Sequence, residues 1–274
     1  DLDAQIELLR GNDVVVLLNG LPNIPGELGS PEYEHKFGPF VNATAAHMAE
    51  KGFDTDHFAF YPIDEPGGYG WAHINSMVAF GKMLRAANPK AMLYVDGGGE
   101  LAMFEAMAPY IGIWCPAYSM LAESSKTMDV VRHSGKMLWS YDCSYGYSRP
   151  VGPNIKNTNV AAQFLTAPLY TFRHGATGLG YWCYNIGDSP WARTQFEYPL
   201  VYPGRTKPVA SRRWEAVREG LEDFRILTAL RERTEDGLLD AGVRERIRAL
   251  IEARLPAEMM FMENFYATQT LSTA

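Results

Sequence analysis

Short apolar runs rich in β-forming residues alternate with longer stretches of helical apolar spacing along most of this chain. Such alternation is typical of a parallel sheet whose strands are connected by helices. Strands are predicted near residues 13–19, 57–63, 91–96, 111–116, 137–142 and 177–184, and helices near 38–51, 71–87, 101–108, 123–134 and 160–173. The pattern therefore predicts an α/β fold.

The loops after the predicted strands differ from the returns that lead from helix to strand. Polar and aromatic loops such as Asn19-Gly20-Leu21-Pro22 and Asp96-Gly97-Gly98-Gly99 follow strands, whereas the returns are short. This asymmetry predicts a TIM (β/α)8-type barrel, whose active site is built from loops at the carboxyl ends of its strands. A doubly wound sheet is the structural alternative, but the chain lacks the G-x-G-x-x-G spacing of its phosphate-binding turn.

The predicted strands are two short of the eight that a barrel needs. Because the chain opens in a helix-like segment, we expect the first two barrel strands to lie upstream of Asp1, leaving a gap beside the strand at 14–18. Residues 1–233 are predicted to form a partial barrel with strands three to eight. A long helix is predicted from Ser211, a good N-cap, and residues 234–274 are predicted to add further helices.

Charge and composition limit the partners and cofactors of a chain of 274 residues. The formal charge of −7 and the lack of a basic stripe argue against nucleic acid, whose binding needs clustered Lys and Arg. The longest apolar runs are too short to cross a membrane. Cys115, Cys143 and Cys183 form no Cys-x-x-Cys pair, and the histidines show no H-E-x-x-H, so we expect neither a metal nor another cofactor.

The tripeptide Asp64-Glu65-Pro66 ends the apolar run at 57–63. Neighbouring side chains on a regular strand point to opposite faces, so both acids can share one pocket only where the pleat breaks. Pro66 supplies that break, because it has no N–H to continue a central ladder. The sequence therefore predicts a carboxylate pair at the rim of the sheet, with two solvated loop acids as the alternative interpretation.

Four segments give the chain a resemblance to the catalytic barrel of glycoside hydrolase family 123, the β-N-acetylgalactosaminidases. They are Asp64-Glu65-Pro66, then 139–143 with Arg149-Pro150 and Asn154 after it, then 180–185, and finally 211–224. The last segment is similar to the closing helix of the family over consecutive positions. The likeness spans roughly residues 13 to 230, and it implies that Asp64 and Glu65 follow the fourth barrel strand.

The resemblance implies hydrolysis of terminal β-linked N-acetylhexosaminides, with N-acetylgalactosamine as the expected sugar, and a secreted or periplasmic location. Adjacent acids cannot straddle a sugar as the separated carboxylates of most glycosidases do. They suit substrate-assisted retention, in which the 2-acetamido oxygen attacks the anomeric carbon. Asp64 would orient the acetamido nitrogen, and Glu65 would be the general acid and base, with a pKa raised by Asp64 and by partial burial.

Aromatic and amide side chains near the predicted strand ends are candidates for binding the glycan. These residues are Tyr118, Trp139, Tyr141, Trp182, Tyr184 and Asn185. Asp96 and Asp142 also end strands, and a classical retaining glycosidase that uses Glu65 and Asp142 is an alternative. A non-catalytic carbohydrate-binding barrel is another.

Overall fold

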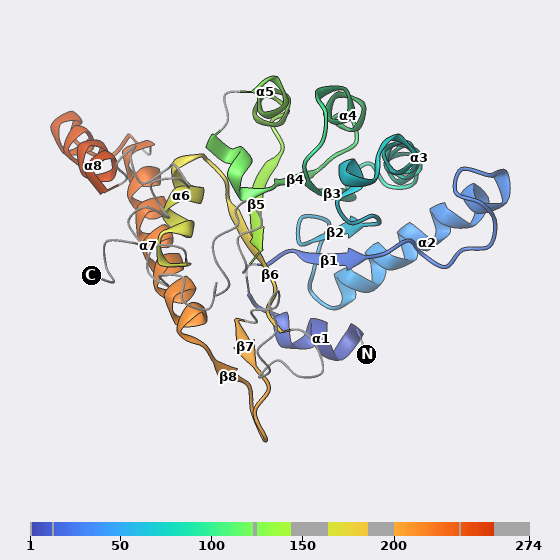
Figure 1. The fold of residues 1–274 in the computed structure, drawn as a ribbon, viewed down its shortest axis with the longest axis horizontal. Helices are drawn as coiled ribbons and strands as arrows, with labels where there is room; N and C mark the ends of the chain where they lie inside the picture. Colours follow the sequence, from blue (N-terminus) through green and yellow to red (C-terminus); the bar gives the residue numbers. More distant parts are fainter. Residues whose placement is uncertain are drawn as a thin grey trace, which may run out of the picture. The chain divides into compact units, whose positions relative to one another are not determined.

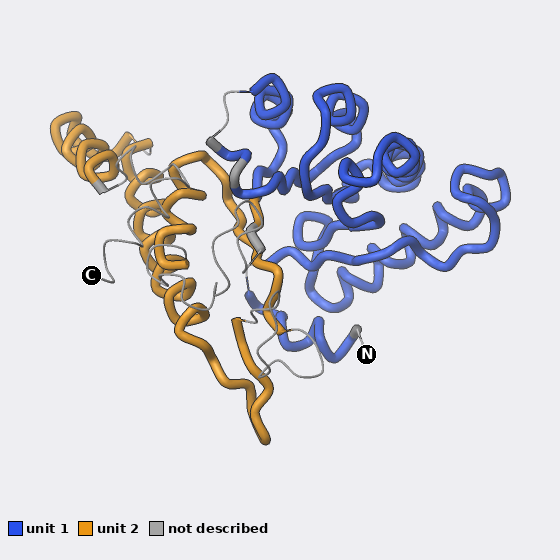
Figure 2. The backbone as a smooth tube through the Cα atoms, viewed as in Figure 1, with its two compact units in different colours: residues 1–139 blue, residues 140–274 orange. Residues whose placement is uncertain are grey.

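The computed structural model describes residues 2–12, 14–122, 125–143, 164–185, 200–235 and 237–254. Contacts within the chain define two compact units, residues 1–139 and residues 140–274 (Figure 2). The domain boundary predicted after residue 233 falls near the end of helix α7 (Arg212–Glu235) and stays a prediction.

Six strands form one sheet in the order of the chain, and all six lie where strands were predicted. They are β1 (Val16–Asn19), β2 (Phe58–Tyr61), β3 (Met92–Gly97), β4 (Ile113–Pro116), β5 (Met137–Cys143) and β6 (Gly178–Trp182). Each pair from β1 to β5 is parallel. This unbroken order is that of a (β/α) barrel, since a doubly wound sheet reverses its order at a switch point. The predicted α/β class is confirmed.

Strand β1 lies at the edge of this sheet, and within the described ranges the sheet is not a closed eight-stranded barrel. A pocket of about 560 Å³ lies beside β1, bounded by the loop that follows it and by helix α2 (Pro31–Glu50). Its lining is mostly apolar and includes Leu18, Phe40 and Met48. The two strands expected upstream stay a prediction.

Helices of unit 1 pack in chain order, α2 on α3 (Trp71–Ala87), α3 on α4 (Leu101–Met107) and α4 on α5 (Lys126–His133). Figure 1 shows α3, α4 and α5 side by side over the strands of that unit. Helix α3 has the predicted bounds, but α2 begins ahead of the predicted start at 38. Ser30 is the reason, because its hydroxyl accepts a hydrogen bond from the Tyr33 N–H at 3.3 Å, and Pro31 occupies the first helical position.

Helix α1 (Leu2–Leu9) is attached to the end of α2. Asp3 lies 2.7 Å from His47 Nε2 and 3.0 Å from Lys51 Nζ, and Ile6 is buried beneath it. The helix-like opening of the chain is therefore confirmed as a helix of unit 1.

Every residue of strand β2 is buried, as in sheets covered on both faces. Phe58 and Phe60 point to the helical side, where Phe60 meets Phe80 with ring centroids 6.1 Å apart. Tyr61 points to the opposite face because side chains alternate along a strand. There its ring packs edge-on against Tyr94 at 4.7 Å. This second face leads to the candidate site.

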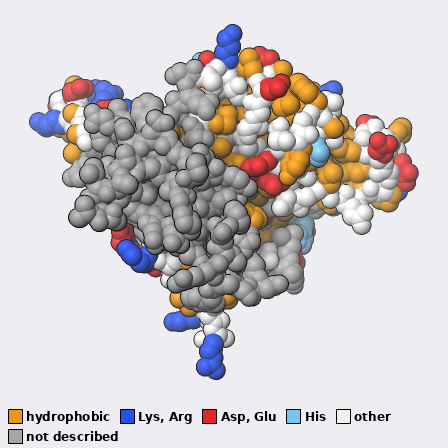
Figure 3. Space-filling view, viewed as in Figure 1, with side chains coloured by type: hydrophobic (Ala, Val, Ile, Leu, Met, Phe, Trp, Pro, Cys, Tyr) orange, Lys and Arg blue, Asp and Glu red, His pale blue; other side chains and the backbone are white. Residues whose placement is uncertain are grey.

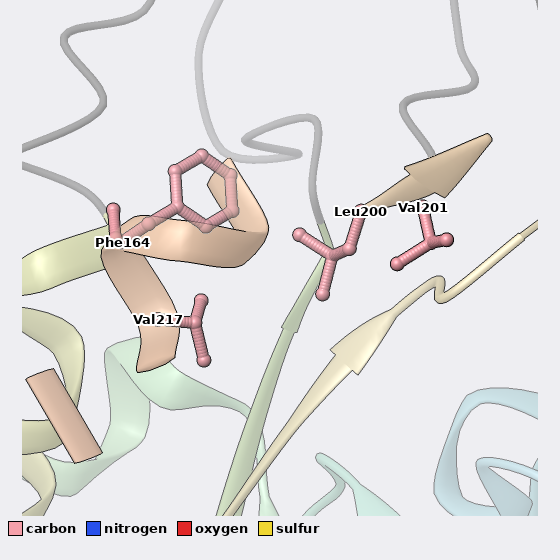
Figure 4. Close-up of a cluster of buried hydrophobic side chains, with 5 residues drawn as sticks. Phe164, Leu200, Val201 and Val217 are labelled. Carbon is pink, nitrogen blue, oxygen red and sulfur yellow. The ribbon is translucent and has the colours of Figure 1, made fainter. Parts of the chain in front are cut away.

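Unit 2 contains α6 (Ala167–Arg173), β6, β7 (Val201–Tyr202), β8 (Val209–Ala210), α7 and α8 (Ala241–Arg254). Figure 4 shows Phe164, Leu200, Val201 and Val217 converging in one of its apolar clusters. Helix α8 lies within the tail, 234–274, for which further helices were predicted, and residues 255–274 of that tail lie outside the described ranges.

Helix α7 begins where the sequence predicted. The Ser211 hydroxyl accepts a hydrogen bond from the Trp214 N–H at 3.2 Å and so caps the helix. On its exposed side Arg218 pairs with Glu215 at 3.0 Å and also with Glu222. The helix thus has an amphipathic character with a salt-bridged face.

Candidate active site

Asp64 and Glu65 lie just beyond the carboxyl end of β2, and both residues are exposed. The strand ends at Tyr61, and the short 3-10 helix η1 (Pro66–Tyr69) begins directly after Glu65. Glu65 has φ 41° and ψ 53°, and it is the only non-glycine residue with positive φ in the described part of the chain. Strained backbone of this kind persists where the surroundings hold it in place. The partial burial expected for Glu65 is not found.

Asp96, on strand β3, holds this turn from the neighbouring strand. Its Oδ1 accepts a hydrogen bond from the Glu65 N–H at 2.9 Å. Its Oδ2 is hydrogen-bonded to the hydroxyl of Tyr61, and the same hydroxyl is hydrogen-bonded to Oδ1 of Asp64. One buried phenol therefore connects the carboxylate of Asp64 to the residue that fixes the backbone of Glu65.

Glycines bring the loops after β2 and β3 into close contact. Gly97 has φ +84°, and a Cβ placed there would lie 3.1 Å from Cβ of Glu65. A Cβ on Gly67 would lie 1.9 Å from the Gly98 carbonyl oxygen. Only glycine at these positions permits such an approach. The backbone of the loop after β3 thus packs against the turn that carries Glu65.

Replacing Gly97 with alanine is expected to lower kcat/KM about tenfold to a hundredfold, because the new methyl group would push against Glu65. Gly98→Ala is the matched control, since its methyl group would meet only Met120 Sδ at 3.6 Å. Steady-state kinetics and the melting temperature of both variants check this. Equal losses of kcat/KM in the two variants would contradict a direct effect on Glu65.

Burial and the hydrogen bonds set the ionisation of this group of residues. Burial raises the pKa of the Tyr61 phenol, and the hydrogen bond to Asp64 raises it further, so Tyr61 keeps its hydrogen. Burial also raises the pKa of Asp96 to about 6, against the opposing hydrogen bonds from Tyr61 and from the Glu65 N–H. Burial raises the pKa of the Cys115 thiol, which is therefore no nucleophile.

Two of the predicted glycan contacts belong to unit 1. Trp139 is half-buried, and its ring lies 6.0 Å from that of Tyr94, which also packs on Tyr61. Trp139 thus joins the aromatic row that leads to Asp64. Tyr118 begins the 3-10 helix η2 (Tyr118–Ala122) and is buried.

The other four predicted contacts belong to unit 2. Trp182 and Tyr184 are each 53% exposed, Asn185 is exposed, and Tyr141 is half-buried. The ring of Tyr184 packs edge-on against Trp214 at 5.7 Å, which joins two of the segments that carry the family resemblance. Asp142 belongs to β5 by its backbone, and its side chain lies outside the described part of the chain. Glycan contact by these residues stays a prediction.

Tyr61 and the role of Asp96 were missed by the sequence analysis. Tyr61 lies in an apolar run and was assigned no function, although it lies only three residues before Asp64. Its polar hydroxyl in a fully buried strand is the signal that could have revealed it, because a buried phenol usually finds a hydrogen-bond partner.

No group of three or more His, Cys, Asp or Glu residues in the described ranges could hold a metal ion. No helix in these ranges has the length and apolar character of a membrane span. On the face seen in Figure 3, the Lys and Arg side chains that are drawn in colour lie scattered around the margin.

The sequence matches the family profile described as "Glycoside hydrolase 123, catalytic domain" over residues 21–230. The fold, the acid pair at a strand end and this match define the class of protein as a glycoside hydrolase. The chain belongs to glycoside hydrolase family 123. The predicted resemblance is thereby confirmed.

The comparison with solved structures found two proteins that are named as glycosidases. One is a GH10 xylanase from Thermobacillus composti, with 12% identity, a TM-score of 0.43, and coverage of 76% of this chain and 75% of that one. Another is a putative alpha-L-fucosidase from Bacteroides thetaiotaomicron, with 11% identity, a TM-score of 0.39, and coverage of 74% of this chain and 64% of that one. No curated protein matches the sequence.

Proposed function

We propose that this glycoside hydrolase cleaves terminal β-linked N-acetylhexosaminides, with N-acetylgalactosamine as the sugar, by substrate-assisted retention. The observation that supports this is the pair of adjacent acids on one exposed turn, with Asp64 hydrogen-bonded to Tyr61 and Glu65 held by Asp96. Two carboxylates that act from opposite sides of a sugar normally come from separate positions, about 5–5.5 Å apart in retaining enzymes. Adjacent acids on one turn suit a mechanism in which the substrate supplies the nucleophile.

In the first step, the carbonyl oxygen of the 2-acetamido group attacks the anomeric carbon while the bond to the leaving oxygen breaks. Glu65 transfers its proton to the leaving oxygen, and Asp64 accepts a hydrogen bond from the acetamido N–H and stabilises the positive oxazolinium ring. In the second step, the Glu65 carboxylate takes a proton from water, which attacks the anomeric carbon and opens the ring. Two inversions give net retention, and Glu65 ends protonated as it began.

The roles of the two acids fit their surroundings. Glu65 is exposed at the end of a sheet strand, where a leaving group can approach it, and its backbone is fixed by the 2.9 Å hydrogen bond to Asp96. Asp64 has one oxygen engaged by Tyr61, so its second oxygen is the one that would accept from the acetamido N–H. We further propose that Trp182, Tyr184 and Asn185, with Tyr118, Trp139 and Tyr141, contribute to glycan binding.

The test compares two aryl β-galactosides that differ only at C2 of the sugar. The full-length protein is expected to hydrolyse the 2-acetamido substrate at least about a hundredfold faster than the 2-hydroxy substrate, because the latter offers no nucleophile. A thiazoline mimic of the bicyclic intermediate is expected to bind about 10²-fold or more tighter than substrate. Comparable kcat/KM for the two galactosides, with weak thiazoline binding, would contradict the proposal.

A further inference from the structure

The Tyr61 hydroxyl lies between two carboxyl groups, Oδ1 of Asp64 and Oδ2 of Asp96, within hydrogen-bond distance of both. Tyr61 is the last residue of β2 and is buried, and its ring is held edge-on against Tyr94. Its hydroxyl position is thus set by the sheet and not by the loop. The two carboxyl groups therefore contact the same hydroxyl, and the position of that hydroxyl is fixed.

One hydroxyl carries only one hydrogen, and an ionised carboxylate can only accept. Tyr61 can therefore donate to Asp64 or to Asp96, but not fully to both. The second contact needs a hydrogen of its own, and the raised pKa of Tyr61 means that this phenol does not give up the one it has. A proton on one of the two carboxyl groups satisfies both contacts.

Burial distinguishes the two carboxyl groups. Asp64 is exposed, whereas Asp96 is half-buried on strand β3, and burial disfavours the charged form of a carboxyl group. The contacts of Asp96 also match those of a neutral acid. Its Oδ1 accepts from the Glu65 N–H at 2.9 Å, as a carbonyl oxygen does, and its Oδ2 faces Tyr61, as an acid hydroxyl would.

The surrounding charges act in the same direction. Burial raises the pKa of Asp96 to about 6, and the negative charges of Asp64 and Glu65 also raise it. Hydrogen bonds from Tyr61 and from the Glu65 N–H oppose this rise. From strand β4 the group that interacts with Asp96 is the buried Cys115 thiol, which stays uncharged because its own pKa is raised.

We propose that Asp96 is protonated on Oδ2 and donates a hydrogen bond to the Tyr61 hydroxyl. Tyr61 then donates its own hydrogen to Asp64. Asp96 and Tyr61 are thus positioning residues that orient the carboxylate of Asp64 and the backbone of Glu65 at once. When Asp96 ionises, the hydrogen of Tyr61 is drawn to Asp96 and Asp64 loses its donor. For its effect on turnover this inference rests on the proposed function, but the location of the proton does not.

Infrared difference spectroscopy of the full-length protein near pH 5 tests the location of the proton. Asn is the neutral isostere of a protonated Asp, so Asp96→Asn keeps an acceptor for the Glu65 N–H and a donor for Tyr61. One protonated-carboxyl band that titrates near pH 6, separate from any band of Glu65, is expected in wild type. This band should remain in the control Asp64→Asn and be absent from Asp96→Asn. A band that vanishes in Asp64→Asn and persists in Asp96→Asn would overturn the proposal.

Should Asp96→Asn fail to fold, carbon-13 spectra of wild type and of Asp64→Asn, both labelled at aspartate, decide the same question. One aspartate carboxyl that titrates near pH 6 is expected in wild type, and it should remain in Asp64→Asn. If no aspartate carboxyl titrates between pH 5 and pH 7, the proposal is overturned.

Stability provides a second readout that needs no substrate. The ordinary aspartate pKa is 3.8, so between that value and about 6 the folded protein binds a proton at Asp96 that the unfolded chain does not. Wild type therefore loses stability as the pH rises through this window, and Asp96→Asn does not. We compare the folded-to-unfolded ratio of Asp96→Asn with that of wild type at each pH. The variant's ratio divided by the wild-type ratio is expected to rise about tenfold to a hundredfold from pH 4 to pH 7. A ratio independent of pH would contradict the proposal.

The consequence for turnover has its own test. The kcat/KM of Asp96→Asn relative to wild type is expected to rise about tenfold between pH 5 and pH 7.5, since the variant cannot ionise. A relative kcat/KM that is the same at both pH values would overturn the positioning role. If wild type hydrolysed no N-acetylhexosaminide, the proposed function would fall, and the infrared band would still decide where the proton lies.

Discussion

Replacing Glu65 with glutamine is expected to lower kcat by about 10²–10⁴-fold on substrates with poor leaving groups, because general acid catalysis contributes about that much. Glutamine keeps the size and the exposed position of Glu65 but has no acidic proton to give to the leaving oxygen. On aryl glycosides with good leaving groups, which need little protonation, the loss should be much smaller. Steady-state kinetics over a series of leaving groups measure the difference.

Glu105→Gln is the matched control for this experiment. Glu105 is an exposed glutamate on helix α4, and its replacement makes the same chemical change away from the strand ends. We expect this variant to retain wild-type kinetics on every substrate. If Glu65→Gln lost equal activity on good and poor leaving groups, Glu65 would have a role other than proton donation.

Replacing Asp64 with asparagine is expected to lower kcat about a hundredfold or more on 2-acetamido substrates, because the developing oxazolinium charge loses its carboxylate. Asp142→Asn should be comparatively mild. This ranking follows from the proposed mechanism, in which the nucleophile belongs to the substrate and no protein carboxylate attacks the sugar. Kinetics of the two variants on one substrate measure it.

A covalent nucleophile at Asp142 would reverse this ranking. A 2-fluoro glycoside would then trap a glycosyl adduct on the protein, since a retaining enzyme with its own nucleophile forms a covalent intermediate. Mass spectrometry of the protein after such labelling distinguishes the two mechanisms. An adduct on Asp142 would refute substrate-assisted catalysis. The absence of any adduct, together with a strongly lowered kcat of Asp64→Asn, would support it.

The sequence was enough to predict the strands and most helices, because their signals are local. Short apolar runs that alternate with helical stretches predicted all six strands, and the N-cap at Ser211 predicted the start of α7. The predicted start of α2 at residue 38 was wrong. Gly38 and Pro39 lie inside this helix, which is capped earlier in the chain, at Ser30. Local signals fail where a helix continues through residues that usually end one.

The acid pair could be predicted from the sequence by itself, because an Asp-Glu-Pro tripeptide after an apolar run marks the end of a strand. The hydrogen bonds that hold the pair could not be predicted. Asp96 is far from Asp64 in the chain, and only the pairing of β2 with β3 brings its carboxyl group to Tyr61 and to the Glu65 N–H. The left-handed backbone of Glu65 and the close approach of Gly97 also depend on two loops meeting. The sequence thus determined which residues carry the charge, and the tertiary structure decided which of them are joined by hydrogen bonds and which are buried, because both depend on distances across neighbouring strands.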